Sequence, residues 1–395
     1  MDERSAAVLS RSGQTLGWCM ILGGTREVFG VLRLRTAALR CREWGPLAPE
    51  FCSCLRRVST CLLALLLLGC CHSPQPTSSL KLQRFGFSSP HMGTMFQITL
   101  YAPDEAAARS AARSAFARVA ALDDIMSDYQ ADSELMRLCD APPGRPVRVS
   151  ADLFDVLEKA QRFSALSQGA FDVTVGPFVR LWRFARKKKV LPTPAEITAA
   201  AASVGYKKLR LARRQHTVTL LVPNMRLDLG GIAKGYAAEE ALAVLKGRGL
   251  THALVAASGD IAVGDPPPGQ RGWRVTIAGI GALARSSAGT VLLHNAGIST
   301  SGDTEQFVEI GGTRYSHIID PVTGLGLTHQ IQVTIIAPNA TTTDALATGV
   351  SVMGPERGLA LVDSFPRTAA LVLTRSDGKD RVWTSRRFKS IALKE

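Results

Sequence analysis

The stretch Leu227-Asp228-Leu229-Gly230-Gly231-Ile232-Ala233-Lys234-Gly235 joins a predicted strand to a predicted helix that continues to about Leu245 and ends at Gly247. Glycines at such a junction let the backbone approach a ligand closely, and amide groups at a helix start attract phosphate. Lys234 adds a point charge suited to a pyrophosphate, and Asp228 can face a metal or a hydroxyl-rich ligand. A glycine-rich turn with a surface lysine is the alternative. The Gly-x4-Gly-Lys-Ser/Thr pattern of a Walker A loop is absent.

Periodic patterns on either side of this stretch predict one α+β catalytic domain of mixed sheets packed with helices. Residues 94–102 alternate like a strand, and from Asp104 apolar residues recur at three- and four-residue spacing, as in an amphipathic helix. Ser150 and the pair Thr193-Pro194 are typical helix starts. Further strands are expected around 207–222, 252–257, 272–278, 289–293, 307–310 and 331–336, with another helix near Thr343. Because strands bunch late and helices are irregularly spaced, α+β is favoured over a doubly wound sheet.

Composition narrows the class of partner. The chain has 395 residues, of which 46% are hydrophobic, so it is a packed protein rather than a disordered one. Its net charge of +14 suits an anionic partner such as a nucleotide, a nucleic acid or a lipid surface. Aromatic residues make up only 6%, which disfavours nucleic acid because base stacking needs exposed rings. A basic cluster, Arg183 with Arg186 to Lys189, is interpreted as a solvated loop, with an anionic membrane or partner as the alternative.

A short apolar segment near the N-terminus has the features of an export signal. Arg56 and Arg57 precede an apolar run from Val58 to Leu68, which is followed by Gly69 and Cys70. A basic region, an apolar core of this length and a small residue before the cleavage point describe a secretory signal peptide. The cysteine after the small residue resembles the lipobox of bacterial lipoproteins, so Cys70 is expected to be lipidated. The run is shorter than the roughly 20 residues that span a bilayer.

This signal predicts three parts of the chain. Residues 1–69 would be an N-terminal extension and lipoprotein signal peptide, 70–84 the lipidated cysteine and its tether, and 85–395 the catalytic domain. Translation is expected to start near residue 55, because signal peptides begin about 15–30 residues before their cleavage site. The protein would then be lipid-anchored on a bacterial membrane, facing the periplasm or another extracytoplasmic side. An ordinary cleaved signal, or a cytosolic protein with an apolar N-terminal helix, is the alternative.

Cysteine usage agrees with a domain that needs no disulfides. Seven of the eight cysteines lie at or before Cys71, and only Cys139 lies beyond. Structural disulfides in the folded part are therefore not expected. Neither a cysteine pair nor a His-Glu-x-x-His motif suggests zinc there.

Two later segments carry candidate chemistry. Asp344-Ala345-Leu346-Ala347-Thr348 places a carboxylate and a hydroxyl four residues apart on one helical face, a pair suited to Mg²⁺. The alternative is an acid in the first turn of a helix with an inward threonine. His317 is a candidate general base because imidazole titrates near neutrality, although most single histidines are satisfied polar residues.

Two further patterns argue against a dinucleotide-binding fold and a serine hydrolase. Residues 279–284, Gly-Ile-Gly-Ala-Leu-Ala, imitate a dinucleotide fingerprint, but a strand rather than a helix follows, so a hairpin is expected. Residues 256–260 lack the first glycine of a Gly-x-Ser-x-Gly nucleophile elbow, which disfavours a serine hydrolase.

In their order along the chain, these motifs resemble the ApbE family of FAD:protein FMN transferases. The resemblance covers about residues 85–375. It rests on Met92-Gly93-Thr94, Met126 to Tyr129, Asp132 to Leu135, Ala170 to Pro177, Asp228 to Gly235, Ser258 to Asp260, Ser299 to Asp303, Ser316 to Gly324 and Asp344 to Thr348. Lipoprotein export also fits that family.

The resemblance implies a set of site residues. FAD would be the substrate, in contact with Met92, Tyr129, Ala170, Phe171, Asp172, Asp228, Lys234 and Ile319. Mg²⁺ would be bound by Asp344, Thr348 and the backbone carbonyl of Gly231. Family members often hold a second acid directly before this threonine; Ala347 stands there instead, which is expected to lower metal affinity. Ser258 stands where glycine is usual and Val322 where a basic residue is common, and neither change removes a group that the chemistry requires.

The implied reaction cleaves the FAD pyrophosphate, transfers FMN to a protein threonine and releases AMP. Mg²⁺ and Lys234 would neutralise charge on the phosphates, and His317 would take the proton of the acceptor hydroxyl. The implied acceptors are extracytoplasmic flavoproteins, including subunits of Na⁺-pumping and Rnf-type redox complexes. Three alternatives stay open: a Mg²⁺-dependent FAD pyrophosphatase giving FMN and AMP, a non-catalytic flavin-binding lipoprotein, and a periplasmic solute-binding lipoprotein.

Overall fold

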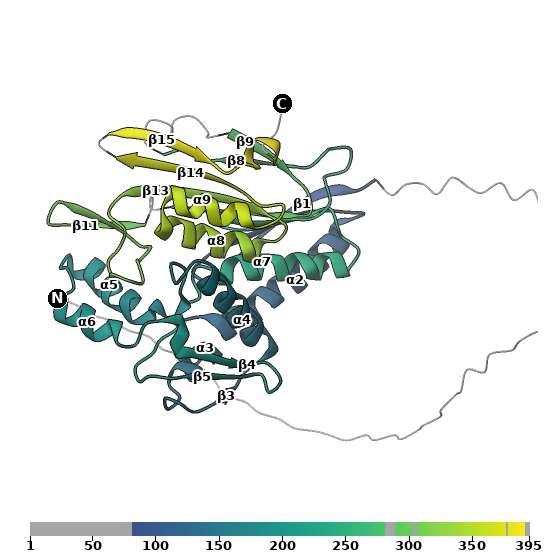
Figure 1. Ribbon diagram of the computed structural model, residues 1–395. Helices are drawn as coiled ribbons and strands as arrows, with labels where there is room; N and C mark the ends of the chain where they lie inside the picture. The colour runs from purple at the N-terminus through teal and green to yellow at the C-terminus, as the bar shows by residue number, and fades with distance from the viewer. Residues whose placement is uncertain (1–80, 281–288, 303–305, 377, 392–395) are drawn as a thin grey trace, which may run out of the picture. The chain divides into compact units, whose positions relative to one another are not determined.

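An eight-stranded antiparallel sheet is the centre of the fold. The computed structural model describes residues 81–280, 289–302, 306–376 and 378–391. The strand order in the sheet is β1-β2-β6-β7-β10-β13-β14-β15 (Figure 1). The strands are β1 (Gln83–His91), β2 (Thr94–Ala102), β6 (Ala253–Ala257), β7 (Asp260–Val263), β10 (Ala296–Gly302), β13 (Gln330–Ala337), β14 (Ala369–Ser376) and β15 (Lys379–Thr384).

Helices cover one face of this sheet. They are α2 (Glu105–Met126), α4 (Ala151–Leu166), α7 (Ala233–Gly247), α8 (Ala340–Met353) and α9 (Pro355–Ser364). Strand periodicity sends alternate side chains to opposite faces. Ala370 and Val372 of β14 therefore enter the core beneath the helices, whereas Leu371 and Leu373 enter a second core on the other face. A hairpin of β8 (Trp273–Ile277) and β9 (Gly289–Leu293), with α10 (Phe388–Ile391), completes that second core.

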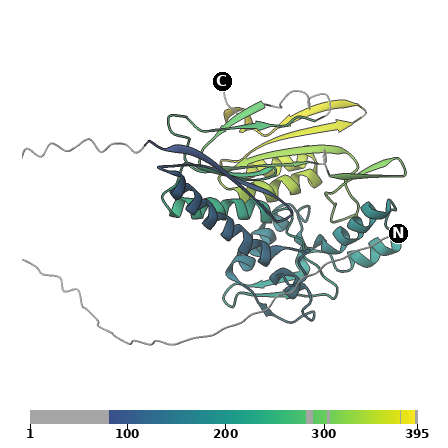
Figure 2. The same cartoon turned by 180° about the vertical axis from the view of Figure 1, so that it is seen from behind.

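Two smaller groups of elements extend from the helical layer. One contains α3 (Glu134–Cys139) and a three-stranded sheet of β3 (Val147–Arg148), β5 (Thr217–Leu220) and β4 (Leu209–Ala212), preceded by η2 (Tyr206–Lys208). The other contains η1 (Val173–Val175), α5 (Gly176–Lys188), α6 (Pro194–Ala201), β11 (Phe307–Ile310) and β12 (Thr313–Ser316). Figures 1 and 2 show α5 and α6 at the opposite end of the described part from the start of β1.

The α+β class is confirmed, and several element starts agree with the sequence chemistry. The side chains of Asp104, Ser150 and Thr193 cap α2, α4 and α6, and Thr193 forms a full capping box with Glu196. Helix α8 begins three residues earlier than expected, because Asn339 accepts a hydrogen bond from the Thr342 amide at 2.9 Å.

Strand β1 was missed by the sequence prediction. It contains glycine, serine and proline, which weaken a strand pattern. It is nevertheless paired with β2 along its whole length, from Gln83 opposite Ala102 to His91 opposite Thr94. The two-residue turn between them has Met92 and Gly93 at positive φ, +49° and +69°, as a tight hairpin turn requires.

The interpretation of the basic cluster as a loop was wrong. Arg183 and Arg186 to Lys188 belong to α5, and Lys189 ends it in a left-handed conformation with φ +55°. The antiparallel pairing of β8 with β9 agrees with a hairpin around 279–288, although residues 281–288 lie outside the described ones. The predicted signal segment and Cys70 also lie outside them. Within the described ranges, no helix is long and apolar enough to cross a membrane.

Candidate functional site

A cleft of about 770 Å³ collects most of the predicted site residues. Its volume is within the range of roughly 300–1,000 Å³ that is usual for small-molecule sites. The predicted residues that line it are Met92, Tyr129, Phe171, Asp172, Asp228, Gly231, Lys234, His317, Ile319, Asp344 and Thr348. Ala170 is not among the lining residues. These residues come from segments up to 256 residues apart in the chain, from Met92 to Thr348, and the fold brings them to one place.

The glycine-rich stretch enters the cleft as a tight turn before α7. The Asp228 amide donates to the carbonyl of Val173 at 2.8 Å, and an Asp228 carboxylate oxygen accepts from the Gly230 amide at 2.8 Å. Burial, and then the neighbouring Asp128, raise the pKa of Asp228. Asp228 therefore stabilises the turn in addition to facing the cleft.

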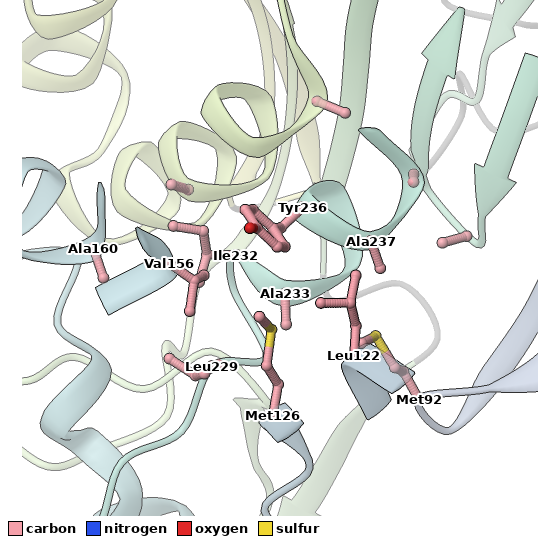
Figure 3. Close-up of a cluster of buried hydrophobic side chains, with 14 of the residues drawn as sticks. Met92, Leu122, Met126, Val156, Ala160, Leu229, Ile232, Ala233, Tyr236 and Ala237 are labelled. Carbon is pink, nitrogen blue, oxygen red and sulfur yellow. The ribbon is translucent and has the colours of Figure 1, made fainter. Parts of the chain in front are cut away.

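A packed hydrophobic cluster holds the start of α7 in place. Figure 3 shows apolar side chains of α2, α4 and α7 together with Met92 and Leu229. The labelled residues are Met92, Leu122, Met126, Val156, Ala160, Leu229, Ile232, Ala233, Tyr236 and Ala237. Because such a core resists rearrangement, the cleft-facing backbone from Gly230 to Lys234 rests on a rigid base.

Asp344 on α8 connects that helix to the start of α7. It is 4% exposed, and Oδ2 accepts from the Gly235 amide at 2.9 Å. Burial and then the nearby Asp260 raise the pKa of Asp344 to about 7. A β-carbon on Gly235 would lie 2.3 Å from the carbonyl oxygen of Ala340, so only glycine permits this approach of the two helices. The Gly235 amide at the start of α7 is thus bound by Asp344 and is not open to a ligand.

Gly231, Asp344 and Thr348 form the candidate metal centre. Thr348 follows Asp344 by one helical turn on α8. A β-carbon on Gly231 would lie 2.8 Å from Thr348 Oγ1 and 3.3 Å from the Phe171 ring. The backbone of Gly231 thus passes directly against the threonine hydroxyl, and a carboxylate, a hydroxyl and a backbone carbonyl share one region. Oxygen donors of these kinds are the ligands that hard cations prefer.

Lys234 and Asp260 form a partly buried ion pair in the same cleft. Burial alone would lower the pKa of Lys234, but the carboxylates of Asp260 and Asp344 raise it above the ordinary lysine value. Asp260 begins β7 after a turn in which Ser258 has φ +56°. A β-carbon on Gly259 would lie 2.5 Å from the carbonyl oxygen of Thr300, so the turn packs closely on β10. The sequence prediction included the Ser258 to Asp260 motif but did not assign Asp260 to the site.

His317 is held in one tautomer by the carbonyl oxygen of Gln306. That oxygen lies 3.1 Å from His317 Nδ1 and 3.0 Å from its backbone nitrogen. A carbonyl only accepts hydrogen bonds, so Nδ1 carries the proton and Nε2 keeps its lone pair. Burial, followed by the positive charges of Arg186 and Lys234, lowers the pKa of His317 to about 4. The imidazole is therefore neutral at physiological pH.

Asp172 has a structural role in this arrangement. One carboxylate oxygen accepts from the Thr174 amide and hydroxyl at 2.8 and 2.7 Å, and the other accepts from the Tyr206 amide at 2.7 Å. Burial raises its pKa, and these hydrogen bonds oppose the change. Asp172 thereby caps η1 and fixes the turn that presents Phe171 beside Gly231.

Tyr129 and the turn that contains Met92 and Gly93 lie close together in the cleft. The Met92 amide donates to Asp123 at 2.7 Å, which fixes the β1–β2 turn on α2. A β-carbon on Gly93 would lie 3.2 Å from the Tyr129 hydroxyl, and Tyr129 remains 60% exposed. Ile319 lines the cleft from the small core that also contains Phe178 and Trp182.

The sequence prediction missed the cationic side chains of α5. Arg183 lies 2.6 Å from Asp128 and 3.7 Å from Asp228, and its guanidinium is 5.7 Å from the centre of the Tyr129 ring. Arg186 lines the cleft one turn later. Val179, Arg183 and Arg186 follow one another at spacings of four and three residues, which places them on one helical face. This pattern is visible in the sequence if the segment is taken as a helix rather than a loop.

The fold and this cleft define a member of a known enzyme family. Residues 92–372 match the model of the ApbE family, and the chain belongs to that family.

Two relatives align with most of this chain. A protein of Escherichia coli (strain K12) called FAD:protein FMN transferase is 30% identical over 348 residues, which are 86% of this chain and 98% of the relative. A protein of the same name from Vibrio cholerae serotype O1 is 31% identical over 344 residues, 86% of this chain and all of the relative.

Solved structures share the fold. The flavin transferase ApbE from Vibrio cholerae has a TM-score of 0.72 and 32% identity, covering 78% of this chain and 99% of that one. The apo form of the flavinyl transferase ApbE from Pseudomonas stutzeri has a TM-score of 0.71 and 28% identity, covering 79% of this chain and 97% of that one.

Proposed function

We propose that this chain transfers FMN from FAD to a threonine hydroxyl of an extracytoplasmic flavoprotein, releases AMP, and depends on Mg²⁺. The chain is a transferase of the ApbE family, whose named relatives are FAD:protein FMN transferases. The observation that carries the proposal is the cleft that places Lys234, His317 and the oxygen donors of Asp344 and Thr348 together. These groups suit an anionic diphosphate and an incoming hydroxyl.

The donor set fits a hard cation. Asp344 has a carboxylate and Thr348 a hydroxyl. The backbone of Gly231, whose carbonyl is the third proposed ligand, passes close to that hydroxyl. Mg²⁺ typically keeps water and substrate phosphate as further ligands. Bound there, the ion would neutralise charge that develops on the phosphates. With alanine at position 347, α8 offers one carboxylate in this turn, which supports weaker metal binding.

The reaction exchanges one phosphorus–oxygen bond for another. The threonine oxygen forms a bond to the FMN phosphorus, the bond from that phosphorus to the bridging oxygen breaks, and AMP leaves with the bridging oxygen. The hydroxyl proton passes to Nε2 of His317, whose lone pair is left available by the Nδ1 hydrogen bond to Gln306. Lys234, kept charged by Asp260 and Asp344, stabilises the added negative charge on the phosphates.

The N-terminal segment supports a location outside the cytoplasm. Arg56 and Arg57, the apolar run 58–68 and the Gly69-Cys70 pair form a lipoprotein-like signal. Residues 1–69 are then extension and signal, 70–84 lipidated cysteine and tether, and 85–395 the catalytic domain. Lipidation of Cys70 holds the enzyme on a bacterial membrane, near acceptors such as subunits of Na⁺-pumping or Rnf-type redox complexes.

Intact mass spectrometry tests this function. The full chain is incubated with FAD, Mg²⁺ and a threonine-containing acceptor domain of a Na⁺-pumping oxidoreductase. We expect the acceptor to gain the mass of one FMN less one water, and the gain to be lost with a chelator or in Asp344→Ala. Mg²⁺-dependent FMN and AMP without a modified acceptor would show a pyrophosphatase instead. Bound, uncleaved FAD would show a flavin carrier.

A further inference from the structure

Helix α5 forms one wall of the cleft and is fixed to the segment that carries His317. Phe178, Trp182 and Ala185 pack into a small core with Val308 and Ile319. The Trp182 indole donates to the carbonyl of Gly324 at 2.8 Å, and its ring lies 5.0 Å from that of Tyr315. The neighbouring face of the helix presents Val179, Arg183 and Arg186 to the cleft. The cations on α5 therefore hold a set position relative to the candidate base.

The two cleft-facing arginines differ in their partners. Arg183 is neutralised by Asp128. Arg186 is half-buried, and no ion pair involves it among the residues that the structure describes. Burial, and then the charge of Arg183, lower its pKa. A guanidinium that is partly withdrawn from water without an anion is unfavourable, so this position is suited to an anion that arrives with a ligand.

The chain continues from Arg186 into an exposed basic run. Lys187, Lys188 and Lys189 end α5 and are exposed, and within the described ranges none of them forms an ion pair. The acid of the next helix, Glu196, is used in the capping box with Thr193. Phe184, also on α5, is 60% exposed. Arginine and exposed aromatic side chains are enriched at protein interfaces.

We propose that Arg186, with Lys187 to Lys189, binds a carboxylate of the acceptor protein close to the threonine that receives FMN. The inference rests on the proposed function: Arg186 lines the same cleft as His317, and its charge lowers the pKa of that imidazole, so a threonine delivered to His317 arrives close to Arg186. Charge complementarity selects an acidic segment. Lys234 and the Asp344–Thr348 turn already serve the phosphates of FAD, which leaves Arg186 for the second substrate.

The position of α5 favours a protein over a lipid surface. The helix lies at the opposite end of the described part from the start of β1 (Figures 1 and 2). Arg186 is half-buried and lines the cleft, where a carboxylate on a protein segment can reach it but the flat surface of a bilayer cannot.

The test compares Arg186→Gln with the unchanged full chain. The probes are FAD and the same threonine-containing acceptor domain, used unchanged and with its acidic residues near the threonine converted to amides. We expect Arg186→Gln to raise the KM for the acceptor about tenfold, the value of one charged hydrogen bond, with unchanged affinity for FAD. The amidated acceptor should show the same rise with the unchanged enzyme and no further rise with the variant.

A matched variant controls for net charge and folding. Arg214→Gln removes one exposed charge in the turn between β4 and β5 and should leave the acceptor KM unchanged. An equal effect of both variants, or no effect of Arg186→Gln, would overturn the inference. Loss of FAD affinity with an unchanged acceptor KM would assign Arg186 to the FAD phosphates instead. Reduced binding of Lys187→Gln/Lys188→Gln to anionic phospholipid vesicles, with an unchanged acceptor KM, would assign the run to a membrane.

A binding measurement separates this inference from the transfer reaction itself. If the unchanged enzyme gives no FMN transfer, the proposed function fails. Calorimetric titration of the acceptor domain into the FAD-loaded enzyme then still measures docking. Weaker binding of Arg186→Gln than of Arg214→Gln would support the docking site, and equal binding would refute it.

Discussion

The carbonyl oxygen of Gln306 binds both the backbone amide and Nδ1 of His317, at 3.0 and 3.1 Å. Two hydrogen bonds to one acceptor fix the plane of the imidazole and its tautomer. Because Gln306 precedes β11 and His317 follows β12, the hairpin of these strands sets the direction of Nε2. The base is thus positioned by backbone pairing rather than by a third side chain.

The first prediction concerns pH. With the pKa of His317 lowered to about 4, the step in kcat/KM that depends on His317 should lie near pH 4 instead of 6.5. His317→Gln should lower kcat by roughly 10²–10⁴-fold, the usual contribution of a general base. A pH–rate profile of the two proteins measures both effects. An acid limb at pH 6–7 that disappears in the variant would contradict the environment described for His317.

The lowered pKa of His317 also makes the free energy of unfolding depend on pH. The folded state resists protonation of His317, while the unfolded chain takes up the proton near pH 6.5. The free energy of unfolding should therefore fall as pH decreases from about 6.5 to about 4. In His317→Gln this contribution should be absent. Urea unfolding at several pH values checks it, and an identical pH dependence in both proteins would be the opposing result.

The second prediction concerns the metal centre. Gly231→Ala would place a β-carbon 2.8 Å from Thr348 Oγ1 and displace that hydroxyl. We expect Mg²⁺ affinity to fall roughly 10–100-fold, as when the surroundings of a metal ligand are disturbed. Isothermal titration with Mg²⁺ in the presence of FAD measures this. Gly247→Ala, on the same helix α7 with open space around its added β-carbon, is the matched control and should bind Mg²⁺ normally.

A third prediction concerns the turn before Asp260. Ser258 has φ +56°, which a side chain disfavours by about 1 kcal/mol relative to glycine. Ser258→Gly should raise the free energy of unfolding by about that amount. Gly259→Ala should lower it, because the added β-carbon would meet the Thr300 carbonyl oxygen at 2.5 Å. Denaturant unfolding of both variants gives the answer; a stabilised Gly259→Ala would refute the close packing of this turn on β10.

The fourth prediction separates stability from activity. Arg118 on α2 binds Asp152 at 2.5 and 2.7 Å and Glu240 at 2.6 Å, joining α2, α4 and α7. Arg118→Met should cost about 2 kcal/mol, less than the 3–5 of a fully buried pair, because these side chains keep partial exposure. Thermal unfolding measures the loss, and the KM for FAD should not change. A raised KM with an unchanged melting temperature would contradict this structural role.

Acid should weaken the same cluster. Arg118 lowers the pKa of Asp152 below its ordinary value of 3.8. The pair therefore contributes stability above that pH and loses it as pH falls through the lowered pKa. The difference in stability between the unchanged protein and Arg118→Met should shrink below pH 4, and a difference that is constant down to pH 2 would show that the ion pair contributes little.

The sequence by itself determined the local structure and the family. Alternation in 94–102 and the capping residues Asp104, Ser150 and Thr193 specify a strand and helix starts within a few residues, so they can be recognised without the fold. The motif order identified the ApbE family, and with it the cleft residues from Met92 to Thr348. These are short-range patterns, in which each residue reports on its near neighbours.

The tertiary structure alone decided which charged side chains are paired with an opposite charge and which can still bind a ligand. Asp260 pairs with Lys234 across 26 residues, and Arg183 pairs with Asp128 across 55, so neither pairing leaves a local pattern in the chain. The predicted ligand Asp172 is engaged by amides of its own turn and of Tyr206, while Arg186, interpreted from sequence as solvated, faces the cleft. Electrostatics and desolvation depend on distances through space, which only the folded chain defines.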